Sequence, residues 1–144
     1  MKKILAAVLA MVFALALLTA CGSSMKDGTY RAEYSSFDDH GWKDFVEVTV
    51  SSGKITAVDY DAVNEEGTRK SEDAAYKESM EPVSGTYPEK FSSELEQQLV
   101  DKQEVKKVDT VAGATNSSDA FKVLATEALK NAKNGKTDAA IVTR

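Results

Sequence analysis

The amino-acid sequence predicts an α+β domain in which two or three helices pack against an antiparallel β-sheet. The first half of the chain holds three segments in which apolar and polar residues alternate, which is the period of a half-buried strand. The second half holds segments in which apolar residues recur every three or four positions, which is the period of an amphipathic helix. About 120 residues follow the apolar N-terminal segment, enough for one domain with a single core.

Three strands are predicted, over residues 27–34, 45–50 and 54–63. In the second of them Val46, Val48 and Val50 share one face, while Glu47 and Thr49 occupy the other. The sequence Ser-Ser-Gly-Lys between the second and third strands is typical of a tight turn. The three strands therefore form an antiparallel meander.

Two helices are predicted after the strands, over residues 71–80 and from 88 to about 101. Ser71 is a suitable N-cap for the first helix. Pro82 and Pro88 bracket a turn that contains Gly85, so the first helix is expected to end before that turn. Pro88 occupies the first position of the second helix, where its missing N–H costs nothing. The second helix is expected to cover the sheet.

The C-terminal third predicts a strand, a turn of small residues and a helix. Residues 105–111 carry the β-branched residues and partial alternation of a short strand. Ser117 and Ser118 are good N-cap types for a helix that runs to about residue 133, with Gly135 as its C-terminal cap. Residues 136–144 have no strong pattern and are expected to form either a mobile tail or an added edge strand.

The N-terminus has the pattern of a lipoprotein signal peptide. Two lysines precede an apolar run of about 15 residues, which is short of the roughly 20 needed to span a membrane as an uncleaved helix. Residues 1–20 are therefore predicted to be removed, leaving Cys21 as the lipidated first residue of a Leu-Thr-Ala-Cys sequence that resembles a lipobox. Residues 22–26 are a tether of roughly 16 Å at most, so the domain is expected at the extracytoplasmic face of the membrane, close to the bilayer.

The mature chain is acidic. Removing residues 1–20 takes away two of the 18 basic residues and none of the 23 acidic residues, which leaves a net charge of −7. Nucleic acid and an anionic lipid surface would both be repelled at long range, so neither is expected as the main partner.

Several kinds of chemistry are excluded by composition. Cys21 is the only cysteine, and once lipidated it leaves no thiol for a disulfide, a metal site or a nucleophile. Asp38, Asp39 and His40 are adjacent residues that project in different directions, and no second histidine exists, so a solvated loop is expected here and no metal site. A hydrolase is also disfavoured, because no catalytic triad can be recognised.

The turn before the last predicted helix is the best candidate for a binding site. Gly113 and Ala114 leave room for a ligand to approach the backbone. The unpaired amides of a helix N-terminus favour an anionic group such as phosphate. On these residues alone, an ordinary strand-to-helix turn with a serine cap is the simpler interpretation.

Asp109-x-x-Ala112-Gly113-Ala114-Thr115 resembles the flavinylation motif Asp-x-x-(Ser/Thr)-Gly-Ala-(Thr/Ser) of the FMN-binding domain family. That family includes the C subunit of the sodium-pumping NADH:quinone reductase, the G subunit of the Rnf complex and extracellular electron-transfer lipoproteins. The resemblance covers residues 27–135 and departs at Ala112, where Ser or Thr is usual. It implies FMN joined covalently through its phosphate to Thr115 by a separate flavin transferase that uses FAD and magnesium.

The resemblance also implies a set of residues around the flavin. Asp109 would orient the motif or be recognised by the transferase. The backbone around Gly113 and Ala114, with the hydroxyls of Ser117 and Ser118, would hold the phosphate. Four residues of the middle segment are expected to line the isoalloxazine ring: Asn64, Lys70, Tyr76 and Met80. The alternative for this last group is that Tyr76 and Met80 belong to the core and Lys70 is solvated.

The function implied by the resemblance is electron transfer without enzymatic turnover. A membrane-anchored flavoprotein would carry electrons from a membrane donor to an extracellular or membrane acceptor, and the flavin would supply the redox chemistry. Trp42 is expected either to pack on the flavin or to close one end of the core. Two other classes stay open on the residues alone: a non-redox ligand-binding lipoprotein, and a structural or signalling lipoprotein.

Overall fold

The computed structural model describes residues 24–144, so the predicted signal peptide and the lipidation site at Cys21 lie outside the described residues. The elements are β1 (Gly28–Tyr34), β2 (Lys43–Ser51), β3 (Lys54–Val63), a 3-10 turn η1 (Lys70–Glu72), α1 (Ala74–Ser84), α2 (Pro88–Lys102), a second 3-10 turn η2 (Val105–Lys107), α3 (Thr115–Asn134) and β4 (Ala140–Val142). The predicted α+β class is confirmed.

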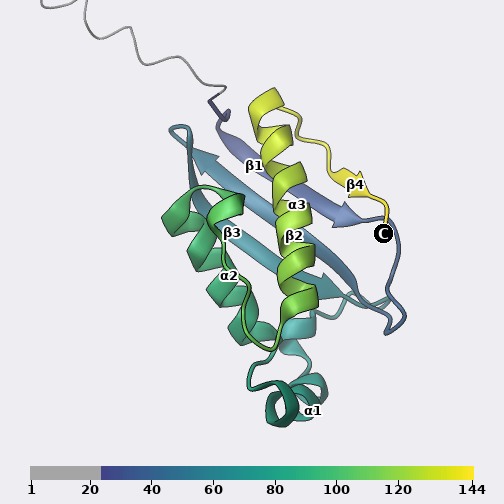
Figure 1. Ribbon diagram of the computed structural model, residues 1–144. Coiled ribbons are helices and arrows are strands. Elements are labelled where there is room, and N and C mark those ends of the chain that lie inside the picture. Colours follow the sequence, from purple (N-terminus) through teal and green to yellow (C-terminus); the bar gives the residue numbers. More distant parts are fainter. Residues whose placement is uncertain (1–23) are drawn as a thin grey trace, which may run out of the picture.

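Strands β1, β2 and β3 form the predicted antiparallel meander (Figure 1). Tyr30 lies opposite Val48, and Ala32 lies opposite Val46, so side chains of one face enter the core together. At the β2–β3 turn, Ser52 and Gly53 both have positive φ angles, as expected for a tight hairpin.

Strand β4 joins the sheet at its edge and pairs in parallel with β1, which makes the sheet mixed with the strand order β3-β2-β1-β4. The ladder is short, with Ala32 opposite Ala140 and Tyr34 opposite Val142, and Ser35 N–H donates to the Val142 carbonyl at 2.8 Å. Of the two expectations for residues 136–144, the added edge strand is therefore the one observed.

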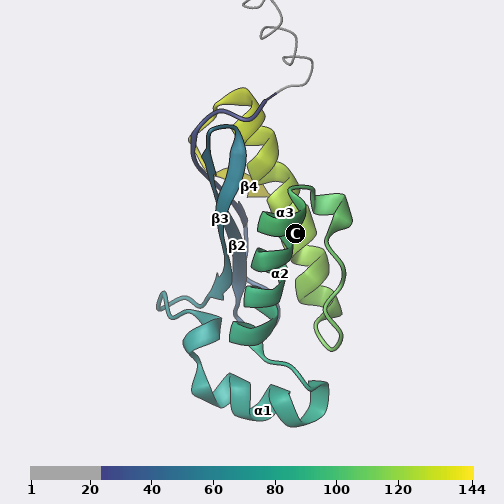
Figure 2. The same cartoon turned by 90° about the vertical axis from the view of Figure 1, so that its left-hand side faces the viewer.

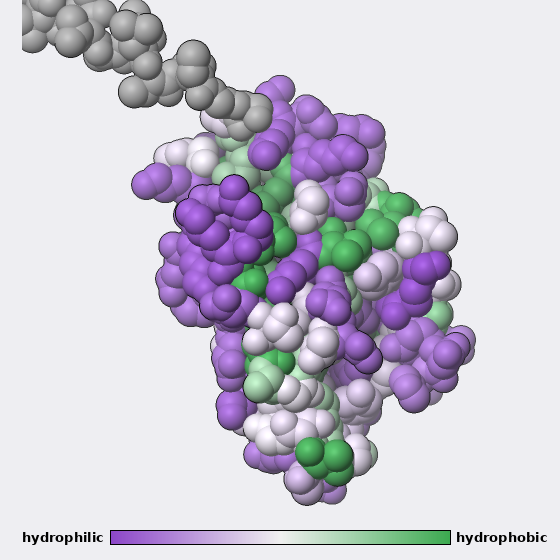
Figure 3. Space-filling model, viewed as in Figure 1, coloured by the Kyte–Doolittle hydropathy of each residue, from purple (hydrophilic) through white to green (hydrophobic). Residues whose placement is uncertain are grey.

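Helices α2 and α3 both lie on one face of the sheet, and α1 lies beyond its lower end (Figures 1 and 2). The core between the two layers is built from the inward residues of the strands and the buried stripes of both helices, including Phe91, Leu95, Leu99, Phe121 and Leu124. Hydrophobic surface between the hydrophilic outer sides of α2 and α3 is visible in Figure 3.

The prediction of a strand over residues 105–111 is wrong. This segment crosses the helix layer from α2 to α3, where no strand lies beside it to complete a ladder. Its backbone instead forms η2, in which Val108 N–H donates to the Val105 carbonyl at 3.0 Å. Val108 and Val111 are buried in the core, so the apolar pattern reflects burial in a connecting segment.

Helix α1 also differs from the prediction at both ends. It begins at Ala74, because the Asp73 carboxylate accepts a hydrogen bond from Tyr76 N–H at 3.0 Å and caps the helix in place of Ser71. It then continues through Pro82, which removes one backbone hydrogen bond near the end of the helix, and stops at Gly85 in the left-handed conformation. Helix α2 begins at Pro88 as predicted.

Candidate functional site

Helix α3 begins at Thr115, three residues earlier than predicted. Ala114 is the N-cap, and no side chain caps this end. The first intrahelical bond runs from Ser118 N–H to the Ala114 carbonyl at 2.8 Å, so the amides of Thr115 and Asn116 in the first turn remain available to a ligand. Thr115 is exposed, which leaves its hydroxyl accessible.

Ser118 stabilises the turn from inside. Its side chain has 0% exposure. Its hydroxyl donates to the Ala114 carbonyl at 2.7 Å and accepts from Val111 N–H at 3.0 Å. Because both interactions are internal, Ser118 fixes the geometry of the turn and its hydroxyl does not face the surface where a phosphate would bind. Ser118 therefore stabilises the first turn from a position inside the helix. The helix begins before Ser117 and Ser118, and neither serine is its N-cap.

Gly113 packs directly against the C-terminal end of α1. Its φ angle is +81°, which favours glycine. A Cβ atom at this position would lie 2.2 Å from the Ser84 carbonyl oxygen and 3.3 Å from Thr86 Cγ2. The motif glycine thus permits a contact between two segments about 30 residues apart, and α1 is placed beside the start of α3.

A cleft of about 440 Å³ lies in front of the N-terminus of α3. Its lining residues come from the loop after β1, from β2, from the η1–α1 segment, from the motif and from the C-terminus: Asp38, His40, Asp44, Lys70, Tyr76, Met80, Gly113, Ala114, Thr115, Asn116, Ser117, Ala120 and Arg144. The fold therefore brings Thr115, Gly113, Ala114 and Ser117 together with Lys70, Tyr76 and Met80, as the sequence predicts.

The wall opposite the motif combines an aromatic ring, a thioether and a cation. Lys70 Nζ lies 4.3 Å from the centroid of the Tyr76 ring, and the Trp42 ring meets Tyr76 edge-on at a centroid distance of 6.0 Å. Trp42 itself is 6% exposed and supports Tyr76 from behind. Helix α1 has no fully buried residue. Tyr76 and Met80 line the cleft, and Met80, which is partly buried, also packs against the hydrophobic core.

An ion-pair cluster holds Lys70 in position. The neighbouring Arg69 pairs with Asp59 and Asp61 on β3, and its Nε lies 2.8 Å from Asp61 Oδ2. Asp61, which is buried, also accepts from the Ser71 N–H at 3.1 Å and from the Ser71 hydroxyl at 2.5 Å. The cluster secures the residues on both sides of Lys70 to the sheet.

The floor of the cleft is a buried polar group that links the sheet to α3. The Tyr60 hydroxyl lies 2.9 Å from Asp44 Oδ2 and 2.9 Å from the Ser117 carbonyl oxygen. Burial raises the pKa of the Asp44 carboxyl and raises that of the Tyr60 hydroxyl well above its usual value. Arg144 Nη2 approaches Asp44 Oδ1 at 3.5 Å from the C-terminal side.

Besides the buried Ser118, two predicted residues lie away from the cleft. The Asn64 side chain accepts from Glu66 N–H at 3.0 Å and Thr68 N–H at 2.9 Å, which shapes its own loop, and it lines a separate hollow beside Trp42. Asp109 is 85% exposed and pairs with Lys102 of α2 at 2.8 Å; the hydrogen bond from that ammonium lowers the pKa of the carboxyl. Asp109 thus fastens the motif to α2.

Asp44 and Arg144 line the cleft but are absent from the predicted site. Asp44 directly precedes the apolar pair Phe45 and Val46 in β2, and its burial beside Tyr60 depends on the register of β2 and β3. Arg144 reaches the cleft only because β4 pairs with β1, and its guanidinium lies 4.2 Å from the Tyr34 ring centroid. An acidic residue next to a predicted strand was the one sequence signal that pointed to Asp44. No sequence pattern pointed to Arg144.

The loop that contains Asp38 and His40 is organised by backbone hydrogen bonds. Asp38 Oδ1 accepts from His40 N–H at 2.9 Å and from Trp42 N–H at 2.9 Å. Within residues 24–144, no three His, Cys, Asp or Glu side chains are grouped to hold a metal ion. Across the same residues no helix is both long and apolar enough to cross a membrane.

Comparison with known proteins agrees with this geometry. The model of the FMN-binding domain matches residues 41–130, which include the cleft wall and the motif. The chain belongs to the FMN-binding domain family. It is 47% identical over 126 residues to the 15 kDa lipoprotein of Treponema pallidum (strain Nichols), an alignment that covers 87% of this chain and 89% of the relative.

Two solved structures share the fold of this FMN-binding domain. The crystal structure of the CPE2226 protein from Clostridium perfringens matches with a TM-score of 0.80 and 44% identity, covering 83% of this chain and 98% of the other. A solution NMR structure from Clostridium thermocellum matches with a TM-score of 0.51 and 32% identity, covering 75% of this chain and 92% of the other.

The residues of the cleft fit FMN as a cofactor. A helix N-terminus with free amides suits the phosphate, and Lys70 and Arg144 add positive charge to the cleft. Tyr76 and Met80 offer a polarisable, largely apolar wall for a flat ring system. Gly113 keeps the backbone of the motif free of a side chain at its closest packing point.

Proposed function

We propose that Thr115 carries FMN through a phosphoester bond and that the protein shuttles electrons between a membrane donor and an extracellular or membrane acceptor. The observation that carries this proposal is the position of Thr115: an exposed hydroxyl at the first residue of α3, in the motif, on the edge of a cleft that suits a flavin. The family match supports FMN as the cofactor.

The bond requires a separate enzyme. A threonine hydroxyl is a weak nucleophile without a base or metal to activate it, and the described hydrogen bonds place no base on the hydroxyl of Thr115. In the proposed reaction, Thr115 Oγ1 bonds to the phosphorus of the FMN half of FAD, the pyrophosphate bond breaks, AMP leaves, and the hydroxyl proton passes to the magnesium-dependent transferase. This transferase is therefore an implied partner.

The chain itself would bind and orient the attached group. The free amides of Thr115 and Asn116 at the start of α3 would bind the phosphate, and Tyr76 with Met80 would shield one side of the ring from water. Lys70 would place its ammonium near the edge of that ring. The flavin, when bound, supplies the one- and two-electron chemistry, and these side chains set its environment.

The same proposal places the protein on a membrane. The Leu-Thr-Ala-Cys21 sequence follows an apolar leader, and the 15 kDa lipoprotein of Treponema pallidum is related over most of its length. Acyl chains on Cys21 would hold the domain at the extracytoplasmic face.

Intact mass of the mature chain, co-expressed with a flavin transferase, tests the proposal. We expect the wild type and Thr115→Ser to gain the mass of FMN less water and to keep flavin fluorescence after denaturation. Thr115→Ala should fold but stay colourless, because it lacks the acceptor oxygen.

Thr110→Ala is the matched control, since it removes an exposed hydroxyl five residues away and outside the cleft. It should be modified as fully as the wild type. Covalent flavin on Thr115→Ala would contradict the site, and an unmodified wild type would contradict covalent attachment and favour a lipoprotein that binds its ligand reversibly.

A further inference from the structure

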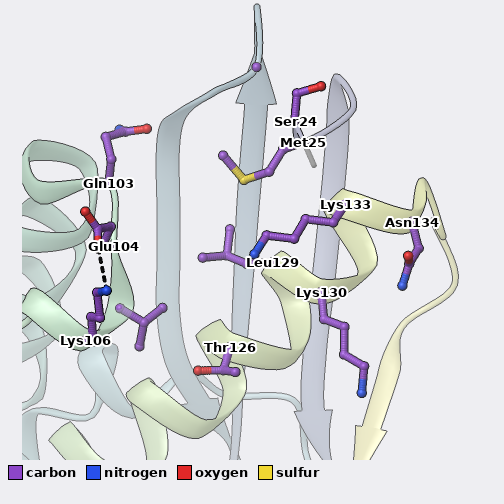
Figure 4. A pocket seen from close by; sticks show the side chains of 12 residues that line it. Ser24, Met25, Gln103, Glu104, Lys106, Thr126, Leu129, Lys130, Lys133 and Asn134 are labelled. Atoms are coloured by element: carbon purple, nitrogen blue, oxygen red, sulfur yellow. Dashed lines mark ion pairs between the residues drawn. The ribbon is translucent and has the colours of Figure 1, made fainter. Parts of the chain in front are cut away.

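A second hollow, larger than the cofactor cleft, lies at the opposite end of α3. Its volume is about 710 Å³, and it opens between η2, the last turns of α3 and the residues that lead into β1 (Figures 1 and 4). We call it the lysine groove, after Lys106, Lys130 and Lys133 on its walls. None of its lining residues takes part in the site proposed for FMN.

The lysine groove is basic in a protein that is acidic as a whole. Its lining includes three lysines and a single carboxylate, Glu104, and Figure 4 shows the Lys130 ammonium at the outer edge, pointing away from the hollow. Lys106 Nζ lies 3.3 Å from Glu104, and Lys130 Nζ lies 3.7 Å from Glu127, but these pairs are exposed and contribute little to stability. Figure 4 shows Lys133 extending across the hollow, so positive charge is available to a ligand there.

The floor of the lysine groove is apolar. Met25, Val105 and Leu129 line it and pack against the hydrophobic core while remaining partly exposed. Cations at the rim of an apolar floor are suited to a molecule that carries an anionic group next to hydrocarbon, because the long lysine side chains can cover apolar surface and still reach the charge. A phospholipid at the surface of a bilayer has this combination.

The lysine groove lies close to the predicted membrane anchor. Ser24 and Met25 line the groove, and Cys21 precedes Ser24 by three residues, so the chain between them spans at most about 10 Å. With acyl chains on Cys21 in the membrane, this end of the domain lies at the headgroup layer.

We propose that the lysine groove binds the headgroup of an anionic phospholipid in the membrane that holds the Cys21 lipid anchor. The ammonium groups of Lys106 and Lys133 contact the phosphate, Lys130 adds positive charge at the outer edge, and the floor contacts the glycerol region. The overall charge of −7 opposes adsorption of the free domain, whereas the anchor brings this one basic surface to the lipid. The contact orients the domain with the start of α3 away from the bilayer.

The test uses the full lipidated chain in nanodiscs of phosphatidylcholine, with or without phosphatidylglycerol, doped with a lipid whose headgroup carries a spin label. Amide NMR signals broaden where the protein approaches the label. With phosphatidylglycerol we expect stronger broadening at η2 and the last two turns of α3 than in phosphatidylcholine alone, and none at Thr115. The combined variant Lys106→Gln, Lys130→Gln, Lys133→Gln should lose this increase with phosphatidylglycerol, because the anchor alone then sets its distance from the headgroups.

A variant with the same change of charge provides the control: Lys77→Gln, Lys90→Gln, Lys122→Gln, all outside the lysine groove. It should keep the wild-type increase. The proposal is overturned if the groove variant keeps the increase, if broadening does not depend on phosphatidylglycerol, or if signals at the groove change only when two protein chains share a disc, which would identify a second copy as the occupant. Flavinylation does not enter the readout, so the result is independent of the role of Thr115.

Discussion

Gly113 belongs to the motif and is also required by the packing of the fold. Its positive φ angle and its contact with the Ser84 carbonyl both require the absence of a side chain. The glycine of the motif would therefore be needed for packing even without a cofactor, because it lets the turn before α3 lie against the end of α1.

Replacing Gly113 by alanine should destabilise the protein and displace α1 from the cleft. Gly67→Ala is the matched control, since Gly67 has the same φ of +81° but nothing lies within 4 Å of its added Cβ. Both variants carry the backbone strain, and Gly113→Ala adds the clash, worth about 1–3 kcal/mol. Urea unfolding should show this difference; equal loss in both variants would show that the Ser84 contact costs nothing.

Thr115, Lys70, Tyr76 and Met80, which the resemblance groups around a flavin, line one cleft in the structure. Only Tyr76 and Met80 could be paired by spacing, since they lie four residues apart on α1. The sequence does not predict that Asp109 pairs with α2. The Asp109–Lys102 ion pair depends on how the segment before α3 packs against α2, and no local sequence pattern predicts the distance between them. Arg144 is the clearest example, since a three-residue edge strand decides where it lies.

The start of α3 is fixed by hydrogen bonds from its first turn to the preceding segment and to the sheet. Ser118 bonds both the Ala114 carbonyl and the Val111 amide, and the Ser117 carbonyl lies on the Tyr60 hydroxyl of β3. The first turn is thus fixed to the preceding segment and to the sheet, while its outward amides stay free. This arrangement presents Thr115 on a rigid support.

Ser118→Ala should lower the free energy of unfolding by about 1–3 kcal/mol, since it leaves the buried Val111 amide without its acceptor. Ser93→Ala, an exposed serine in α2, is the control and should change stability by far less. Amide hydrogen exchange provides the second measurement: exchange at Val111 should accelerate in Ser118→Ala alone. Unchanged exchange there would contradict the role assigned to this hydroxyl.

The contact of α2 with β3 is expected to depend on pH. Glu96 accepts from Tyr60 N–H at 2.8 Å, and burial raises the pKa of its carboxyl from 4.5 to about 7, with Asp59 and Asp61 nearby adding to the effect. A raised folded-state pKa means that the native protein holds the proton more tightly, so this contribution to stability is complete below pH 4.5 and is lost as pH rises to about 7.

Glu96→Gln should remove that dependence. Relative to the wild type, the variant should gain stability between pH 5 and 7, by about 1 kcal/mol once solvent screening of this partly exposed group is considered. Thermal unfolding at several pH values measures it. Parallel pH profiles for the two proteins would show that Glu96 titrates normally.

At the level of elements, periodicity predicts the meander, α2 and α3 because each buries one face over many residues. It fails for residues 105–111, whose valines are buried without belonging to a strand. It also misplaces the first residue of α1, since Asp73 and Ser71 are equally good caps by type and only the bond to Tyr76 N–H distinguishes them.

At the scale of the whole molecule, the two proposed sites lie toward opposite ends of α3. Helix α3 runs for 20 residues along the sheet, with Thr115 at its start and the lysine groove at its last turns. At 1.5 Å per residue, Thr115 lies about 17–29 Å along the helix from the groove residues of α3. The tether joins the domain at the groove end, as Figure 1 shows for the start of β1.

The distance between the two proposed sites determines how far the flavin site lies from the membrane surface. A protein held at one end of α3 diffuses in two dimensions, so the proposed flavin at the other end would travel in a layer roughly 20–30 Å from the lipid surface. Redox groups buried within the bilayer would lie outside its range. A partner that exchanges electrons with Thr115-bound flavin must therefore project a cofactor of its own to that layer, and proteins that remain level with the headgroups would pass beneath it without reacting.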